Sequence, residues 1–289
     1  MEVKQEKLKI KCVDGYELSA ILLQPTEPKA VVQFNGGTGI VKEFYLNFLT
    51  HIASCGYVVL LYDYRGIGES RPASLKNFDA KMSDWGKKDM TDTLAWLNER
   101  FPDLPKLLMG HSMGGQQIGM MHNHHLLKGA LLIATSTGVI SSITKPYRHY
   151  ASLMFNIYTP LVTAIFGYVP LKVLGAGEDL PKYIASEWIS WCNNKHYLFD
   201  FIGKTLHDTH YDKVEMPIHA YIIEDDPIAN SDSVADLLSG YKNAKISTEF
   251  IKVADYQTKN IGHLGLFSRK FKENLWHKPA KELDRMLGK

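Results

Sequence analysis

The sequence has few cysteines, little net charge and no long apolar run. Its three cysteines, Cys12, Cys55 and Cys192, are odd in number and widely spaced, which indicates free thiols rather than a disulfide framework. The formal net charge is only +2, so there is no electrostatic case for binding nucleic acid. No stretch of eighteen uninterrupted apolar residues occurs, and stable membrane insertion is therefore not expected.

The start of the chain offers no targeting signal. The segment from Met1 to Lys7 is charged and is not followed by the apolar core of a signal peptide. Together with the free thiols, this predicts a cytoplasmic protein. The 289 residues, 45% of them hydrophobic, suffice for one large α/β domain or two small ones.

Strand-like and helix-like segments alternate along the chain. Residues 8–12 and 16–23 are predicted to form a hairpin around Asp14-Gly15. Further strands are expected at 30–34, 57–62, 107–109, 129–134, 218–223 and 248–253, and helices at 43–55, 87–100, 116–124 and 272–287. Because short apolar runs are typical of strands buried on both faces, we expect a mostly parallel sheet with helices on both faces.

One segment interrupts this alternation. Residues 136–210 are rich in tyrosine, phenylalanine and tryptophan and contain no clear run of buried strands. We therefore predict one α/β core formed by residues 1–135 and 211–289, with residues 136–210 inserted as a helical cap. Trp188 and Trp191 either contact a substrate from this cap or pack inside it.

The strongest chemical signal is Gly110-His111-Ser112-Met113-Gly114, which follows an apolar run and precedes a helix-like stretch. A serine at a sharp strand-to-helix turn takes a strained conformation that presents its hydroxyl to a ligand. The two glycines stand where a side chain would collide with the neighbouring strand or helix. The N-terminus of the following helix favours developing negative charge. The motif predicts that Ser112 is a nucleophile.

A second motif supports a family resemblance. The segment 62–70, Tyr-Asp-Tyr-Arg-Gly-Ile-Gly-Glu-Ser, is similar to the Asp-x-Arg-Gly-x-Gly-x-Ser segment of serine hydrolases. With the Ser112 motif, it resembles the serine aminopeptidase and monoglyceride-lipase-like group of the α/β-hydrolase superfamily. The resemblance covers both parts of the core but not the aromatic insert.

The resemblance implies the other two members of a catalytic triad. In this superfamily the order along the chain is nucleophile, acid, histidine. Asp226, which follows the predicted strand 218–223, best matches the acid, and Asp225 is the alternative. The histidine must come later, and only His263 and His277 do. His263 lies in a glycine-flanked loop typical of the catalytic histidine, whereas His277 belongs to the closing helix.

The resemblance also implies an oxyanion hole, formed by the backbone N–H groups of Met113 and Gly37. The sequence departs from the family here, because Asn35-Gly36 replaces the usual His-Gly. The glycine-rich loop 36–39 lacks the lysine and spacing of a phosphate-binding P-loop. Phe44 and Tyr45, at the start of the next helix, are candidates for the mouth of the pocket, and core packing is the alternative for Phe44.

The function predicted from these motifs is hydrolysis of carboxylic esters with an apolar acyl or alcohol part, through an acyl-enzyme. Thioester or amide cleavage, or acyl transfer, would use the same machinery, and a non-catalytic small-ligand binder with this fold is the other alternative. No cofactor is expected, and no metal, because the spacing of His122, His124 and His125 lacks the i, i+4 pair of a helical zinc site. The expected partner is a small-molecule ester, and nothing in the sequence fixes an oligomeric state.

Overall fold

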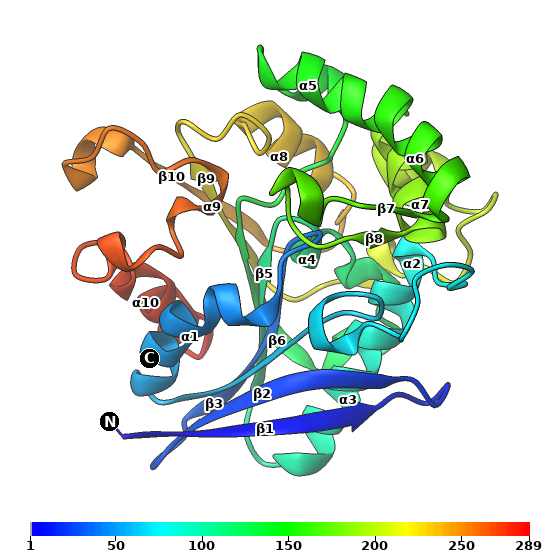
Figure 1. Cartoon of the computed structure of the whole chain (residues 1–289). Helices are drawn as coiled ribbons and strands as arrows, with labels where there is room; N and C mark the ends of the chain where they lie inside the picture. The colour runs from blue at the N-terminus through cyan, green and yellow to red at the C-terminus, as the bar shows by residue number, and fades with distance from the viewer. Residues whose placement is uncertain (1) are drawn as a thin grey trace.

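An eight-stranded sheet forms the centre of the molecule (Figure 1). The computed structural model describes residues 2–289. The strand order is β1-β2-β4-β3-β5-β6-β9-β10. The strands are β1 (Val3–Lys11), β2 (Glu17–Pro25), β3 (Ala30–Asn35), β4 (Tyr57–Tyr62), β5 (Lys106–His111), β6 (Leu127–Ile133), β9 (Ile218–Ile223) and β10 (Ile246–Ile251).

The pairing confirms the predicted α/β class. β2 pairs antiparallel with both β1 and β4, and every other neighbouring pair is parallel. All residues of β3, β4 and β5 are buried, because helices cover both faces of the sheet at these strands. The strands therefore follow the apolar runs of the sequence closely.

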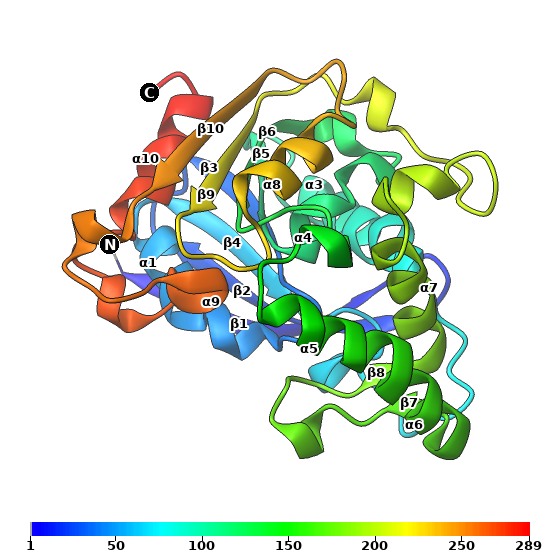
Figure 2. The same ribbon diagram turned by 90° about the horizontal axis from the view of Figure 1, so that it is seen from above.

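Figures 1 and 2 show α1 (Leu46–Ser54) and α10 (His277–Met286) on one face of the sheet. The opposite face carries α3 (Thr91–Arg100), α4 (Met113–Gln116) and α8 (Ser231–Leu238). The short helices α2 (Met82–Asp84) and α9 (Gly262–Gly265) lie in connecting segments. Among residues 2–289, no helix combines the length and the apolar character needed to cross a bilayer.

The helix predicted over residues 116–124 is wrong, because α4 ends at Gln116. The carbonyl oxygen of Gln116 accepts hydrogen bonds from the hydroxyls of Tyr211, at 2.9 Å, and Tyr241, at 3.0 Å. These side chains replace the backbone donor that a continuing helix would supply. Gly119 lies against the ring of Tyr211, and a Cβ there would come within 2.4 Å of it. Tertiary packing thus stops the helix.

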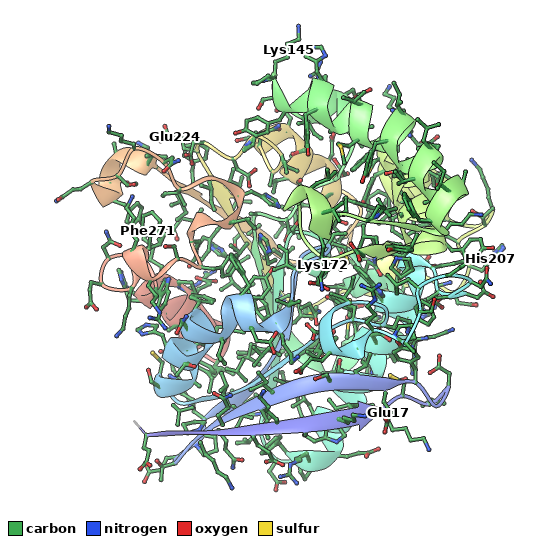
Figure 3. The ribbon with its side chains drawn as sticks, in the orientation of Figure 1. Glu17, Lys145, Lys172, His207, Glu224 and Phe271 are labelled. Atoms are coloured by element: carbon green, nitrogen blue, oxygen red, sulfur yellow. The ribbon has the colours of Figure 1, made fainter. Side chains whose placement is uncertain are left out.

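Residues 136–210, here called the cap segment, leave the sheet after β6 and return to it at β9. They contain α5 (Tyr147–Leu153), α6 (Thr159–Phe166), α7 (Lys182–Cys192) and a two-stranded hairpin of β7 (Tyr168–Val169) and β8 (Leu180–Pro181). The helices gather on one side of the molecule (Figure 2). Lys145, just ahead of α5, lies at the opposite end of the molecule from Glu17 in the β1–β2 hairpin (Figure 3).

Candidate active site

Ser112 stands at the turn between β5 and α4, as the motif predicts. Its φ is +51° and its ψ is −119°, a conformation that residues with side chains rarely adopt. A Cβ on Gly114 would lie 2.0 Å from the carbonyl oxygen of Asn35, and one on Gly110 would lie 2.6 Å from the nitrogen of Gly115. The glycines therefore allow the close approach of helix and strand that fixes this turn.

Two residues far along the chain meet Ser112. The Nε2 of His263 lies 3.0 Å from the Ser112 Oγ, and its Nδ1 lies 2.7 Å from the Oδ2 of Asp226. Because a carboxylate only accepts hydrogen bonds, Nδ1 carries the proton and Nε2 is left to accept from the serine hydroxyl. Both distances are within the range expected for a nucleophile, a base and an orienting acid.

The two neighbouring aspartates have different partners. Asp226 is 3% exposed, and its Oδ1 accepts hydrogen bonds from the N–H groups of Ile228, at 2.8 Å, and Ala229, at 3.0 Å. Asp225 instead accepts from the N–H groups of Ile261, at 2.9 Å, and Gly262, at 2.8 Å. Asp226 thus contacts the imidazole of His263, whereas Asp225 holds the loop that carries it. Sequence reasoning left these two roles open.

The predicted oxyanion donors differ in their surroundings. Met113 is the first residue of α4, so its N–H points out of the helix N-terminus beside Ser112. The N–H of Gly37 donates to the hydroxyl of Tyr45 at 2.9 Å. A Cβ on Gly37 would lie 2.9 Å from the Nδ1 of His111. Gly37 therefore lies against buried polar side chains, and in this structure its N–H already has an acceptor.

Tyr45 and His111 continue this chain of hydrogen bonds. The Tyr45 hydroxyl lies 2.8 Å from the His111 Nδ1, and the His111 Nε2 lies 3.1 Å from the backbone oxygen of His263. Burial, with the neighbouring His263 as a lesser cause, lowers the pKa of His111 well below its usual range. A neutral imidazole has one donor. The carbonyl requires that donor at Nε2, so Nδ1 accepts from Tyr45.

A buried lysine, paired with one buried and one exposed carboxylate, holds the far end of the same loop. The Nζ of Lys42, which is 2% exposed, lies 2.7 Å from the Oδ2 of Asp63 and 2.7 Å from the Oε2 of Glu69. Burial would lower the pKa of Lys42, but its hydrogen bonds to Asp63 and Glu69 raise it overall. Lys42 therefore stays charged. The segment 62–70 thus fixes the loop that follows β3.

A cavity of about 760 Å³ opens at Ser112 and His263, here called the Ser112 cavity. Its volume is that of a typical small-molecule site. Residues from the core, the cap segment and the His263 loop line it. The large apolar lining residues are Ile40, Met113, Tyr147, Trp188, Ile228, Ile261 and Leu264.

The four residues predicted to contact substrate lie in different environments. Trp188 lines the Ser112 cavity. Trp191 is 1% exposed and packs edge-to-face on Tyr197 inside the cap segment, which agrees with the packing alternative. Tyr45 is 1% exposed and lies beneath the site, and Phe44 packs on Tyr45 and Phe267. Neither Tyr45 nor Phe44 is among the residues that line the Ser112 cavity, and the ring contacts of Phe44 agree with the packing alternative.

The described part of the chain, residues 2–289, contains no group of three or more histidine, cysteine, aspartate or glutamate side chains arranged to hold a metal ion. His124 and His125 lie with ring centroids 6.2 Å apart, near His210. Burial lowers the pKa of both His124 and His210.

The sequence matches the model of the family described as serine aminopeptidase, S33, over residues 26–187, more than half of the chain. The chain belongs to this family of α/β-hydrolases. The matched range includes Ser112 and ends before Asp226 and His263. The resemblance drawn from the two motifs is thereby confirmed.

Individual proteins show the same likeness. Over 91 residues the chain is 31% identical to a monoglyceride lipase homolog from Monkeypox virus, and the match spans 31% of either protein. A thermostable carboxyl esterase from Bacillus coagulans superposes with a TM-score of 0.66 at 15% identity, covering 98% of both chains. A soluble monoglyceride lipase variant from Saccharomyces cerevisiae gives 0.66 at 14% identity, covering 99% of this chain and 95% of that one. These structural matches confirm the α/β-hydrolase fold.

Proposed function

We propose that this protein is a serine hydrolase that cleaves carboxylic esters through an acyl-enzyme on Ser112. The observation that carries the proposal is the chain of two hydrogen bonds, of 3.0 and 2.7 Å, that joins Ser112, His263 and Asp226 at a cavity. A serine hydrogen-bonded to an imidazole, which is itself oriented by a buried carboxylate, has a hydroxyl that is reactive at neutral pH. Membership of a hydrolase family supports the same reaction.

In the first half of the reaction, the Oγ of Ser112 attacks the ester carbonyl carbon while His263 takes the serine proton at Nε2. Asp226 holds the imidazole in the required tautomer and stabilises its positive charge. The carbonyl oxygen becomes an oxyanion and accepts hydrogen bonds from the N–H of Met113 and from the loop that follows Asn35. His263 then protonates the departing alcohol, which leaves the acyl group on Ser112.

In the second half, His263 removes a proton from water, and the resulting hydroxide attacks the acyl carbon. The tetrahedral intermediate collapses, the acid leaves, and the proton returns to Ser112. Every proton and electron pair is accounted for by the three side chains and water. The proposal therefore requires no cofactor.

The proposed substrate has an apolar acyl or alcohol part. The apolar lining of the Ser112 cavity, which includes Ile228, Trp188 and Leu264, supports this choice. The outer face of α5, of the helical turn 154–158 that follows it and of α6 is also apolar and open to solvent, with Ile157 54%, Leu161 60% and Ile165 72% exposed. This face continues to Tyr147, which lines the cavity. Exposed apolar surface of this kind is typical of binding regions.

We further propose that residues 136–210 act as the cap over a core of residues 1–135 and 211–289. Gly175, Gly177 and Trp188 of the cap segment line the Ser112 cavity. The cap segment is also tied to the core beneath it, because the hydroxyl of Tyr197 donates to the Oε1 of Gln116 at 2.8 Å. Substrate selection is therefore assigned to this segment, and bond cleavage to the core.

The decisive test compares the wild-type chain with Ser112→Ala on p-nitrophenyl esters of two to sixteen carbons. We expect the wild type to show turnover and covalent labelling by a fluorophosphonate probe. The variant should lose at least about 10⁴-fold in kcat and all labelling, because no other group can form the acyl-enzyme. Equal turnover by the two proteins would refute the proposal. Ligand binding without labelling would identify a non-catalytic binder.

Acyl transfer is separated from hydrolysis by adding competing alcohols or amines to the same assay. The yield of free acid should stay nearly constant if water is the natural acceptor. Matched thioester and amide substrates, compared by kcat/KM, test the choice of bond. A thioester or amide preferred over the oxygen ester would replace the proposed substrate class.

A further inference from the structure

The loop after β3 does not present Gly37 to the Ser112 cavity. The N–H of Gly37 lies 2.9 Å from the Tyr45 hydroxyl, and Tyr45 is 1% exposed. Because Tyr45 donates its own proton to the Nδ1 of His111, its oxygen is free to accept from Gly37. Breaking this bond would leave a buried acceptor unpaired, which costs about 1–3 kcal/mol. Gly37 is therefore engaged beneath the site.

Thr38, the next residue along the chain, faces the Ser112 cavity, whereas Gly37 does not. Thr38 lines the same cavity as Ser112 and Met113. Its Oγ is buried and has no hydrogen-bond partner within residues 2–289. Over the same residues, no acceptor is found for its backbone N–H. Buried hydroxyls are normally paired, so an unpaired one at a cavity points to a partner that arrives with the ligand.

We propose that Thr38, rather than Gly37, completes the oxyanion hole, through its backbone N–H and its hydroxyl. This inference rests on the proposed ester hydrolysis and specifies one residue of it. The tetrahedral oxygen would accept from Met113 on one side and from Thr38 on the other. Both groups of Thr38 donate existing protons, and no bond to the threonine forms or breaks.

The placement of the loop explains why Thr38 takes this role. The turn after Gly37 is closed by the Ile40 N–H, which donates to the Gly37 carbonyl oxygen at 3.3 Å. The Lys42 side chain holds the end of the same loop through Asp63. The loop is therefore fixed at both ends before substrate arrives. Donors that are held in place stabilise a developing charge without a cost of reorganisation.

The first test compares Thr38→Val with Thr38→Ser on p-nitrophenyl butyrate. Valine keeps the shape and loses the hydroxyl, so kcat should fall about 10²-fold while KM changes little. Serine keeps the hydroxyl and should restore most of the rate. Equal kcat values for the two variants would overturn the proposal. Fluorophosphonate labelling of both variants verifies that Ser112 remains reactive.

The second test uses the wild-type chain and so does not depend on how a variant folds. Phenylboronic acid accepts an electron pair from the Ser112 oxygen while the serine proton passes to His263, and the boron becomes a tetrahedral anion in place of the oxyanion. With ¹⁵N-labelled threonine and glycine, the amide proton of Thr38 should move downfield and that of Gly37 should not. A downfield shift of Gly37 alone would overturn the inference. A wild type that neither hydrolyses esters nor forms the adduct would instead refute the proposed function itself.

Discussion

The imidazole of His111 donates a hydrogen bond to the backbone carbonyl oxygen of His263, across 3.1 Å. Ser112, the next residue along the chain, meets the side chain of the same histidine at 3.0 Å. Two consecutive residues thus hold His263 by its backbone and by its ring. Any change that moves His111 should therefore affect the geometry between Ser112 and His263.

Tyr45→Phe tests this connection. The substitution removes the hydroxyl that joins Gly37 to His111 and leaves a buried donor and a buried acceptor unpaired. The free energy of unfolding should fall by about 1–3 kcal/mol. Because His111 also loses its orientation, we expect kcat for a short-chain ester to fall about tenfold, since small misplacements of catalytic groups reduce rates strongly.

Tyr57→Phe is the matched control. Tyr57, on strand β4 and away from Ser112, is also buried. Its hydroxyl donates to the Oδ1 of Asp284 at 2.6 Å. This variant should lose stability while keeping the wild-type kcat. If both variants lower kcat to the same extent, the effect of Tyr45 is general destabilisation rather than positioning.

A pair of variants distinguishes the two aspartates. Asp226→Asn should lower kcat by about 10⁴-fold, because the amide favours the wrong tautomer of the histidine. Asp225→Asn weakens the two backbone hydrogen bonds that hold the His263 loop, and should cost only about tenfold. Steady-state kcat values of the two variants, measured with the same substrate, test this difference. A larger loss in the Asp225 variant would exchange the roles proposed for the two residues.

The sequence predicted the parts of the site that depend on local geometry. Gly-x-Ser-x-Gly after an apolar run fixes a strand, a turn and a helix within a few residues, and Ser112 stands as expected. The order of motifs along the chain led to Asp226 and His263, whose imidazole lies between Ser112 and that carboxylate. The apolar runs likewise predicted the strands, because both faces of the sheet are covered.

The remaining features depend on contacts between distant segments. The end of α4 at Gln116 is set by Tyr211 and Tyr241, which lie about a hundred residues further along the chain. The engagement of Gly37 by Tyr45 depends on His111, a buried histidine inside the Gly-x-Ser-x-Gly motif. A histidine in an apolar strand is the one signal that could have suggested this network. The cap segment contains no recognised motif, so the position of Trp191 could not be derived from the sequence.

The pH dependence of stability follows from buried histidines. Burial, with His263 as a second cause, depresses the pKa of His111 well below the value of about 6.5 expected in the unfolded chain. Above that pH both states are neutral and stability is unaffected. As the pH falls below it, only the unfolded state gains a proton, so the free energy of unfolding decreases by up to about 1.4 kcal/mol per pH unit for this group.

Urea unfolding between pH 5 and 8 tests this, with His111→Gln as the comparison. Four other buried or partly buried histidines whose pKa is lowered, chiefly by desolvation, add to the wild-type slope: His51, His124, His210 and His219. The variant should therefore show a smaller, but not zero, loss of stability below about pH 6.5. Identical slopes for the two proteins would show that His111 takes up a proton as readily in the folded chain as in the unfolded one.

The last prediction concerns chain length. Trp188 borders the Ser112 cavity and also a small cavity of about 30 Å³ inside the cap segment. Leu171, Leu180 and Ile189 line that second cavity, and Phe155 packs against Trp188 at 4.9 Å between ring centroids.

Trp188→Ala should join the two spaces. We expect kcat/KM for twelve-carbon esters, relative to four-carbon esters, to rise about tenfold, because the burial of about two more methylenes, at about 0.8 kcal/mol each, corresponds to about this factor. Trp191→Phe, inside the cap segment, should leave this ratio unchanged. An unchanged ratio in Trp188→Ala would mean that the indole does not limit the acyl chain.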